Sequence, residues 1–149
     1  MKVIIDEIKE TQEEYILFHV KKVDTKVSKA IRFIENMDAY LVGKEDEKLY
    51  KISFKDIFYI ETVDKKSFLY TVDNVFATSE KLYQLEEKLQ FADFIRISKS
   101  MILNIDKIDM IYPTISGRFN AKLLNQEIVT ISRGYVPELK KKLGVGRKE

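Results

Sequence analysis

Short β-rich runs separated by short polar segments dominate the chain from residue 49 to residue 132, and this rhythm restricts the possible folds more than any other feature. Most runs are about four to seven residues long, the usual length of a strand. They cover residues 57–63, 67–72, 75–78, 94–97, 101–103, 108–112, 118–124 and 127–132. The segments between them, such as residues 64–66 and 125–126, have the length of hairpin turns. This pattern predicts a mainly antiparallel β-fold.

Three segments break the rhythm with the apolar spacing of an amphipathic helix. They cover residues 25–37, 79–89 and 134–143. Asp24 or Thr25 can cap the first helix and Ser79 the second. Gly144 ends the third, because glycine accepts the left-handed conformation of a helix C-terminus. The helices are short and sparse, so the fold class is mainly β, and α+β overall.

The first 46 residues predict a small N-terminal unit of ββα-like order. Residues 3–8 and 15–20 are β-rich, a polar run separates them, and the first helical segment follows. A charged turn marks the junction, so we expect a second domain over residues 47–149. A unit of about fifty residues buries little core by itself. We therefore expect residues 1–46 to dimerise the protein or to bind another partner.

Composition excludes several kinds of catalytic chemistry. The 149 residues include no cysteine and one histidine, His19. Disulfides, thiolate zinc sites, cysteine nucleophiles and multi-histidine metal centres are therefore excluded. The 5 glycines form neither a G-x-x-x-x-G-K-[ST] nor a G-x-G-x-x-G phosphate loop. We predict a protein that is not an enzyme and that uses no metal or cofactor.

Membrane and export signals are missing from the sequence. Asp6 and Glu7 follow the first apolar run too soon for the core of a signal peptide. No window approaches the roughly 18 apolar residues of a membrane-spanning helix. We expect a cytoplasmic protein.

Charge is unevenly distributed along the chain. Residues 1–50 hold 9 Lys and Arg against 11 Asp and Glu, whereas the chain from Phe94 onward holds 11 against 5. A basic C-terminal part is typical of a protein that binds a polyanion. The alternative is that these cations only face solvent and that some of them form the basic end of a helix at residues 140–142.

Three loops place polar and basic residues at the ends of apolar strands. They hold Lys65, Lys66 and Ser67, then Ser98, Lys99 and Ser100, then Ser132 and Arg133. Lys and Arg donate to DNA phosphates and, in the major groove, to guanine. Arg96 either packs structurally or reaches a phosphate, and Arg118 is a further candidate phosphate contact. The same cations also fit a simpler role, in which they only solubilise loop tips.

Residues 49–143 resemble the LytTR DNA-binding domain of bacterial transcriptional regulators. The most specific match is Phe-Ile-Arg-Ile-Ser-Lys-Ser-Met-Ile-Leu-Asn at residues 94–104, followed about thirty residues later by Ser-Arg-Gly-Tyr at residues 132–135. Residues 56–61, 68–71 and 82–89 also fit the family pattern. The resemblance covers about two-thirds of the chain.

This resemblance implies an elongated set of small antiparallel sheets with short helices, and not a helix-turn-helix. It implies loops that enter successive major grooves, on promoter sites that are commonly paired direct repeats. By position, the DNA contacts fall on residues 65–67, on residues 98–100 and on Arg133. Ser67 stands where some members of the family have histidine.

The N-terminal extension resembles that of stand-alone LytTR regulators, which carry the run Ser116-Gly117-Arg118. Such regulators are often encoded beside small membrane proteins, so the resemblance implies a regulatory membrane-protein partner. A homodimer fits paired DNA sites, because a second linked contact raises the effective concentration of the first.

We therefore predict a sequence-specific regulator of transcription that binds double-stranded promoter DNA. One alternative is a protein–protein interaction module that does not bind DNA. Another is RNA binding, which favours exposed aromatic residues on a sheet face, with Tyr59, Phe68 and Tyr70 as candidates.

Overall fold

The computed structural model describes residues 1–145, and the last four residues of the expected domain over 47–149 lie outside this range. Within these described residues, ten strands form two sheets, accompanied by three α-helices. The larger sheet contains β1 (Tyr40–Glu45), β2 (Lys48–Ser53), β3 (Tyr59–Val63), β4 (Lys66–Tyr70), β5 (Val75–Thr78), β6 (Phe94–Arg96) and β7 (Met101–Asn104). The smaller sheet contains β8 (Ile108–Pro113), β9 (Phe119–Leu123) and β10 (Ile128–Ile131). The helices are α1 (Thr25–Glu35), α2 (Leu82–Lys88) and α3 (Val136–Leu143).

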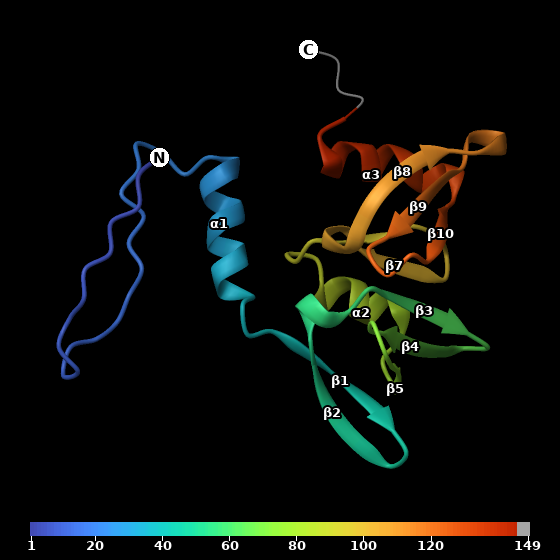
Figure 1. Cartoon of the computed structure of the whole chain (residues 1–149), viewed down its shortest axis with the longest axis horizontal. Coiled ribbons are helices and arrows are strands. Elements are labelled where there is room, and N and C mark those ends of the chain that lie inside the picture. Colours follow the sequence, from blue (N-terminus) through green and yellow to red (C-terminus); the bar gives the residue numbers. More distant parts are fainter. Residues whose placement is uncertain (146–149) are drawn as a thin grey trace.

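Every strand pair in the two sheets is antiparallel, which confirms the fold class predicted from the β-rich runs. The strand order is β2-β1-β5-β4-β3-β7-β6 in the larger sheet and β10-β9-β8 in the smaller one. In Figure 1, α2 lies against the larger sheet and α3 against the smaller one. The short helices therefore cover the sheets rather than form a bundle of their own.

Two apolar cores hold these layers together. Beneath α2, Leu82, Leu85 and Leu89 pack in the cluster that contains Ile60 and Leu69 of the larger sheet. These three leucines have the helical spacing seen in the sequence, and all three are buried. The second core joins the sheets to α3; its fully buried members are Ile97, Leu103, Ala121, Leu123, Ile131 and Leu139.

The helix caps agree only in part with prediction. Asp24 caps α1, where its Oδ1 accepts a hydrogen bond from Val27 N at 2.9 Å, and Gly144 ends α3 with a left-handed φ of 75°. Ser79 does not cap α2. That helix begins at Leu82, and Gln84 Oε1 accepts a hydrogen bond from Lys81 N at 2.8 Å instead. A glutamine in the first turn thus satisfies the backbone N–H at the start of this helix.

The two strands predicted in the N-terminal unit are wrong. Residues 1–23 contain no strand, so α1 is the one element of the expected ββα order that forms. In this region all side chains are exposed except those of Phe18 and Val20, which are half-buried. A β-rich run becomes a strand only when a neighbouring strand pairs with its backbone, and residues 3–8 and 15–20 have no such neighbour within the described chain.

The expected boundary at residue 46 falls inside a hairpin. β1 and β2 are joined through Asp46 and Glu47, both with positive φ, and β1 also pairs with β5 of the larger sheet. Gly43 allows this close packing, because a Cβ at that position would lie 2.5 Å from the Phe76 Cβ. Residues 40–45 are therefore built into the larger sheet together with β2.

Candidate nucleic-acid interface

The β3–β4 turn and the β6–β7 loop lie side by side at one end of the larger sheet. β3 and β7 are antiparallel neighbours with Glu61 opposite Met101, and Thr62 N donates to Ser100 O at 2.8 Å. The β3–β4 turn has two central residues, Asp64 and Lys65, with φ of 50° and 66°. These values describe the tight primed turn that suits the twist of a hairpin. Lys65 is thereby held at the tip.

Two further segments reach the same end. Ser132 N donates to Ile97 O at 2.9 Å, which places Arg133 beside the β6–β7 loop. The β8–β9 turn then touches Arg133, since a Cβ on Gly117 would lie 2.8 Å from Arg133 Cδ. Figure 1 shows the β3–β4 and β8–β9 turns on the right-hand side of the molecule. Four segments that are distant in sequence thus form one edge.

We call the five exposed cations of these segments the basic edge. They are Lys65, Lys66, Lys99, Arg118 and Arg133. Among residues 1–145, the ion pairs within 4.0 Å involve Lys44, Lys88 and Arg96, so none belongs to a member of the basic edge. The basic edge presents cations to solvent without a neutralising partner, as a polyanion-binding surface requires.

Ser67 does not belong to this edge, contrary to the expectation for it. Its side chain is buried, with 3% of the residue exposed, and it shares a 2.9 Å hydrogen bond with the Thr62 hydroxyl across the hairpin. Alternation along β4 turns Lys66 outward and Ser67 inward. Ser67 is thus unavailable for a direct contact with DNA.

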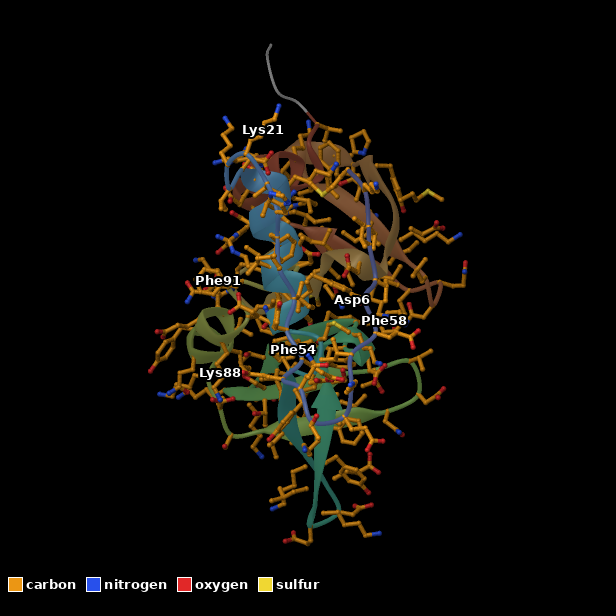
Figure 2. All side chains as sticks on the ribbon, turned by 90° about the vertical axis from the view of Figure 1, so that its left-hand side faces the viewer. Asp6, Lys21, Phe54, Phe58, Lys88 and Phe91 are labelled. Carbon is orange, nitrogen blue, oxygen red and sulfur yellow. The ribbon has the colours of Figure 1, made fainter. Side chains whose placement is uncertain are left out.

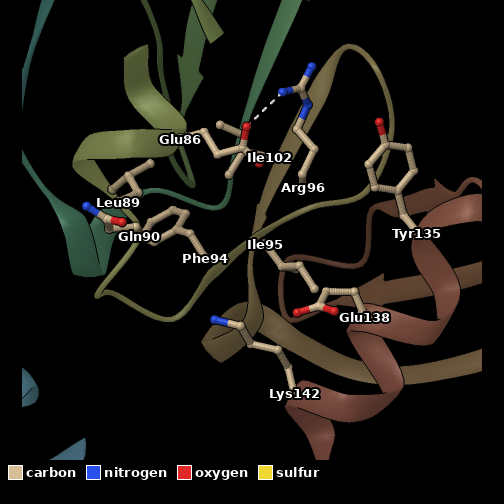
Figure 3. Close-up of a pocket in the computed structure, with 10 residues that line it drawn as sticks. All are labelled: Glu86, Leu89, Gln90, Phe94, Ile95, Arg96, Ile102, Tyr135, Glu138 and Lys142. Atoms are coloured by element: carbon tan, nitrogen blue, oxygen red, sulfur yellow. Dashed lines mark hydrogen bonds and ion pairs between the residues drawn. The ribbon is translucent and has the colours of Figure 1, made fainter. Parts of the chain in front are cut away.

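Arg96 supports the loop that carries Lys99. Its Nε donates to Ser98 O at 2.8 Å, its Nη2 donates to Lys99 O, and its Nη1 lies 3.1 Å from Glu86 Oε1. Figure 3 shows the guanidinium reaching from β6 to this carboxylate on α2. All three guanidinium nitrogens are engaged, and the side chain is 22% exposed. Of the two roles open to Arg96, the geometry supports the structural one.

The serines of the loop differ in exposure. Ser98 is half-buried and its Oγ accepts a hydrogen bond from Ser100 N at 3.2 Å, which closes the loop on itself. Ser100 is exposed beside Lys99. Ser132 is half-buried and makes no side-chain capping hydrogen bond.

Asn104, the last residue of β7, fixes the turn that follows the strand. It is buried; its Nδ2 donates to Ile57 O at 2.8 Å, and its Oδ1 accepts from Asp106 N at 3.0 Å. Glu86 and Gly117 are the site residues that sequence reasoning missed. A glutamate on a helix and a glycine in a loop carry no signal of their own, because their importance depends on Arg96 and Arg133.

The aromatic residues considered for RNA do not form an exposed platform. Tyr59 is buried, and its ring stacks on that of Tyr70 with centroids 4.4 Å apart. Its hydroxyl donates to Glu127 Oε2 at 2.8 Å. Burial and this hydrogen bond both raise the pKa of Tyr59 well above the ordinary value of 10.0. Tyr59 is therefore unavailable for stacking on a base, and Phe68 and Tyr70 are half-buried.

The described part of the chain contains no cluster of three or more His, Asp or Glu side chains arranged to hold a metal ion. Within the same residues, none of the helices combines the length and the apolar character needed to cross a membrane.

Residues 47–144 match the family model described as the LytTr DNA-binding domain. A LytTr DNA-binding domain of a putative methyl-accepting/DNA response regulator from Bacillus cereus has a similar structure, with a TM-score of 0.67 and 28% identity over 70% of this chain and 96% of that chain. These two matches concern the part of the molecule that carries the basic edge.

Two curated relatives differ in how much of their length is matched. The sensory transduction protein LytT of Bacillus anthracis is 35% identical over 67% of this chain, but the match spans 41% of its own length. An HTH-type transcriptional regulator of Staphylococcus aureus strain MSSA476 is 30% identical over 92% of this chain and 93% of its own length. The family match, the similar structure and these relatives agree, and the chain belongs to the LytTR DNA-binding domain family.

Proposed function

We propose that the protein is a sequence-specific regulator of transcription that binds double-stranded promoter DNA through the basic edge. The observation that supports this most strongly is the meeting of four separate segments at one end of the sheets, with five exposed cations and no ion-pair partner for them among the described residues. Loops on a rigid sheet scaffold commonly carry recognition residues. On this proposal the loops enter successive major grooves of paired direct repeats.

Within the basic edge, each side chain has a defined role on this proposal. Lys65, Lys66 and Arg118 lie at hairpin turns and contact phosphates, which set the register on the duplex. Lys99 and Arg133, on adjoining segments, reach base edges, where a planar guanidinium can bind guanine through two hydrogen bonds. Ser98 and Ser100 shape the loop, and Arg96 holds it in place.

Two further parts of the proposal concern organisation. Residues 47–149 form the DNA-binding part, and residues 1–46 dimerise the chain, so that a homodimer engages two sites at once. The protein acts in the cytoplasm without catalysing a reaction. Exposed apolar side chains in the first twenty residues support the assignment of residues 1–46 to association.

The test is a fluorescence-anisotropy titration of the full chain against the DNA upstream of its own gene, with a shuffled duplex of equal length as the control. Binding to several phosphates releases counterions, so the affinity should fall steeply as salt rises, by about 0.9 logarithmic units per contact for each tenfold increase in salt. Preference for the upstream duplex supports sequence-specific regulation. Binding that is absent or insensitive to salt would favour the protein–protein interaction module instead.

A further inference from the structure

Residues 2–22, which we call the N-terminal arm, contain two apolar runs whose side chains are exposed, except for the half-buried Phe18 and Val20. Ile5 in the first run is 83% exposed and Leu17 in the second is 76% exposed. In each run, consecutive residues are apolar, so both faces of the extended backbone are apolar. Such runs are typical of strands buried on both faces. In Figure 1 the arm lies on one side of α1, and the two sheets lie on the opposite side of that helix.

The backbone of the arm also lacks partners. Apart from the turn, where Gln12 N donates to Lys9 O at 3.0 Å, residues 2–20 make no backbone–backbone hydrogen bond with any described residue. Two extended stretches with free N–H and C=O groups are a template for strand pairing with another chain. The arm therefore needs a partner that supplies both hydrogen bonds and apolar contacts.

Charge identifies a partner that fits. The acidic side chains gather toward the turn of the arm, whereas Lys2, Lys21 and Lys22 lie at its base. The acids are Asp6, Glu7, Glu10, Glu13 and Glu14, against the single cation Lys9. Figure 2 shows Lys21 at the upper end of the arm and Asp6 well below it. Two arms laid antiparallel place the acidic turn of each against the basic base of the other, whereas parallel arms place like charges together.

We propose that the arm pairs with the arm of a second copy of this chain, antiparallel and about a two-fold axis. This deepens the homodimer of the proposed function, because it names the segment and its orientation. A stable interface between two chains buries about 1,200–2,000 Å² in total, and exposed apolar side chains such as Ile5 and Leu17 are what each arm offers to it. The turn at residues 36–39 lies between α1 and β1, and the proposed two-fold axis relates the two arms.

The first experiment is sedimentation equilibrium of the full chain, with a double variant of the arm. The full chain should be a dimer at micromolar concentration. Ile5→Asp with Leu17→Asp places two carboxylates in the pairing surface and should weaken self-association by at least about a hundredfold. Leu49→Asp, at an exposed apolar residue of β2, is the matched control and should remain a dimer. A full chain that is monomeric at all concentrations, or an arm variant that still dimerises, overturns the proposal.

The second experiment tests the orientation by charge reversal. Glu13→Lys with Glu14→Lys, and separately Lys21→Glu with Lys22→Glu, should each weaken self-association about tenfold, because each brings like charges together. The variant that combines all four substitutions should regain most of the lost self-association. No recovery in this variant contradicts the antiparallel arrangement.

Binding to a duplex with one site separates the two proposals. The arm variant should bind such a duplex with unchanged affinity, since the basic edge is intact. Loss of self-association with retained binding confirms the role of the arm. If the chain dimerises through the arm but does not bind DNA, the proposal of a DNA-binding regulator is rejected and the arm pairing stands. A monomeric chain that binds DNA rejects the arm pairing alone and assigns the arm to a different protein.

Discussion

The guanidinium of Arg96 lies 3.1 Å from the Glu86 carboxylate while its remaining nitrogens donate to the carbonyls of Ser98 and Lys99. Helix α2, which lies against the larger sheet, is thereby connected to the loop that presents Lys99. The planar guanidinium suits this task, because its donors point in fixed directions and can serve three acceptors at once. Glu86 therefore influences the basic edge although it is not part of it.

Glu86→Gln discriminates between the two roles of Arg96. If Arg96 positions the loop, the loss of the ionic partner should weaken DNA binding about threefold to tenfold, without changing the salt dependence. If Arg96 contacts a phosphate, removal of the competing carboxylate should strengthen binding. The measurement is anisotropy at several salt concentrations. Arg96→Lys should lose as much DNA affinity as Arg96→Ala, because an ammonium lacks the planar fork of a guanidinium.

Lys99→Ala and Arg133→Ala should each weaken DNA binding by about tenfold, the cost of losing a good contact to a base or a phosphate. A variant that loses a phosphate contact should also show a shallower salt dependence. Lys99→Glu should be worse than Lys99→Ala because it sets a negative charge against the phosphates.

The control for these variants is Lys55→Ala. Lys55 is an exposed cation that precedes β3, whereas the β3–β4 turn of the basic edge follows the other end of that strand. All of these side chains are exposed, so the free energy of unfolding should change by less than about 0.5 kcal/mol. Unfolding of the Lys99 or Arg133 variant under the binding conditions would contradict its assignment as a contact residue.

Gly117→Ala should damage the basic edge through Arg133. The residue has a φ of 75°, and its new Cβ would lie 2.8 Å from Arg133 Cδ, so the arginine side chain must move. We expect a loss of stability of about 1 kcal/mol from the backbone strain, together with a severalfold loss of DNA affinity. Gly134→Ala is the control because a Cβ there meets no atom within 4 Å. Equal affinities for the two variants would refute the link between Gly117 and Arg133.

Asn104→Ala should destabilise the fold without acting on the interface. The substitution removes two hydrogen bonds and leaves Ile57 O without that donor in a buried site. Such losses cost about 2–4 kcal/mol. Urea unfolding measures the effect, while DNA affinity measured well below the melting temperature should stay within about twofold. A large loss of affinity in the folded variant would indicate that Asn104 also shapes the loops.

Tyr59 should make the protein less stable in alkali. Its pKa is raised in the folded state by burial and by Glu127, so above pH 10.0 the unfolded chain loses this proton while the folded chain keeps it. The free energy of unfolding therefore falls as the pH rises above that value. Tyr59→Phe should flatten this fall in urea titrations between about pH 9 and pH 11. Tyr83→Phe, at an exposed tyrosine of α2, is the matched control for the loss of one hydroxyl.

Local patterns account for most of the fold from β3 onward, whereas β1 and β2 were not among the predicted strands. The β-rich runs became strands because each had a neighbour at hairpin distance, and the leucines of α2 became buried because their spacing places them on one helix face. Asn104 could be assigned a turn role from its type and position alone. In the candidate site, the same reasoning located the loops with Lys65, Lys99 and Arg133 before any geometry was known.

Local conformation, the candidate surface cations and the family resemblance can thus be inferred from the amino-acid pattern alone. Three-dimensional contacts were needed to show that Ser67 faces inward, that Arg96 is engaged by Glu86, and that the β-rich runs of residues 3–8 and 15–20 form no strand within the described residues. The physical reason is the same in each case. A residue's periodicity and capping depend on its near neighbours, whereas burial, ion pairing and strand pairing depend on which distant segments come into contact with it.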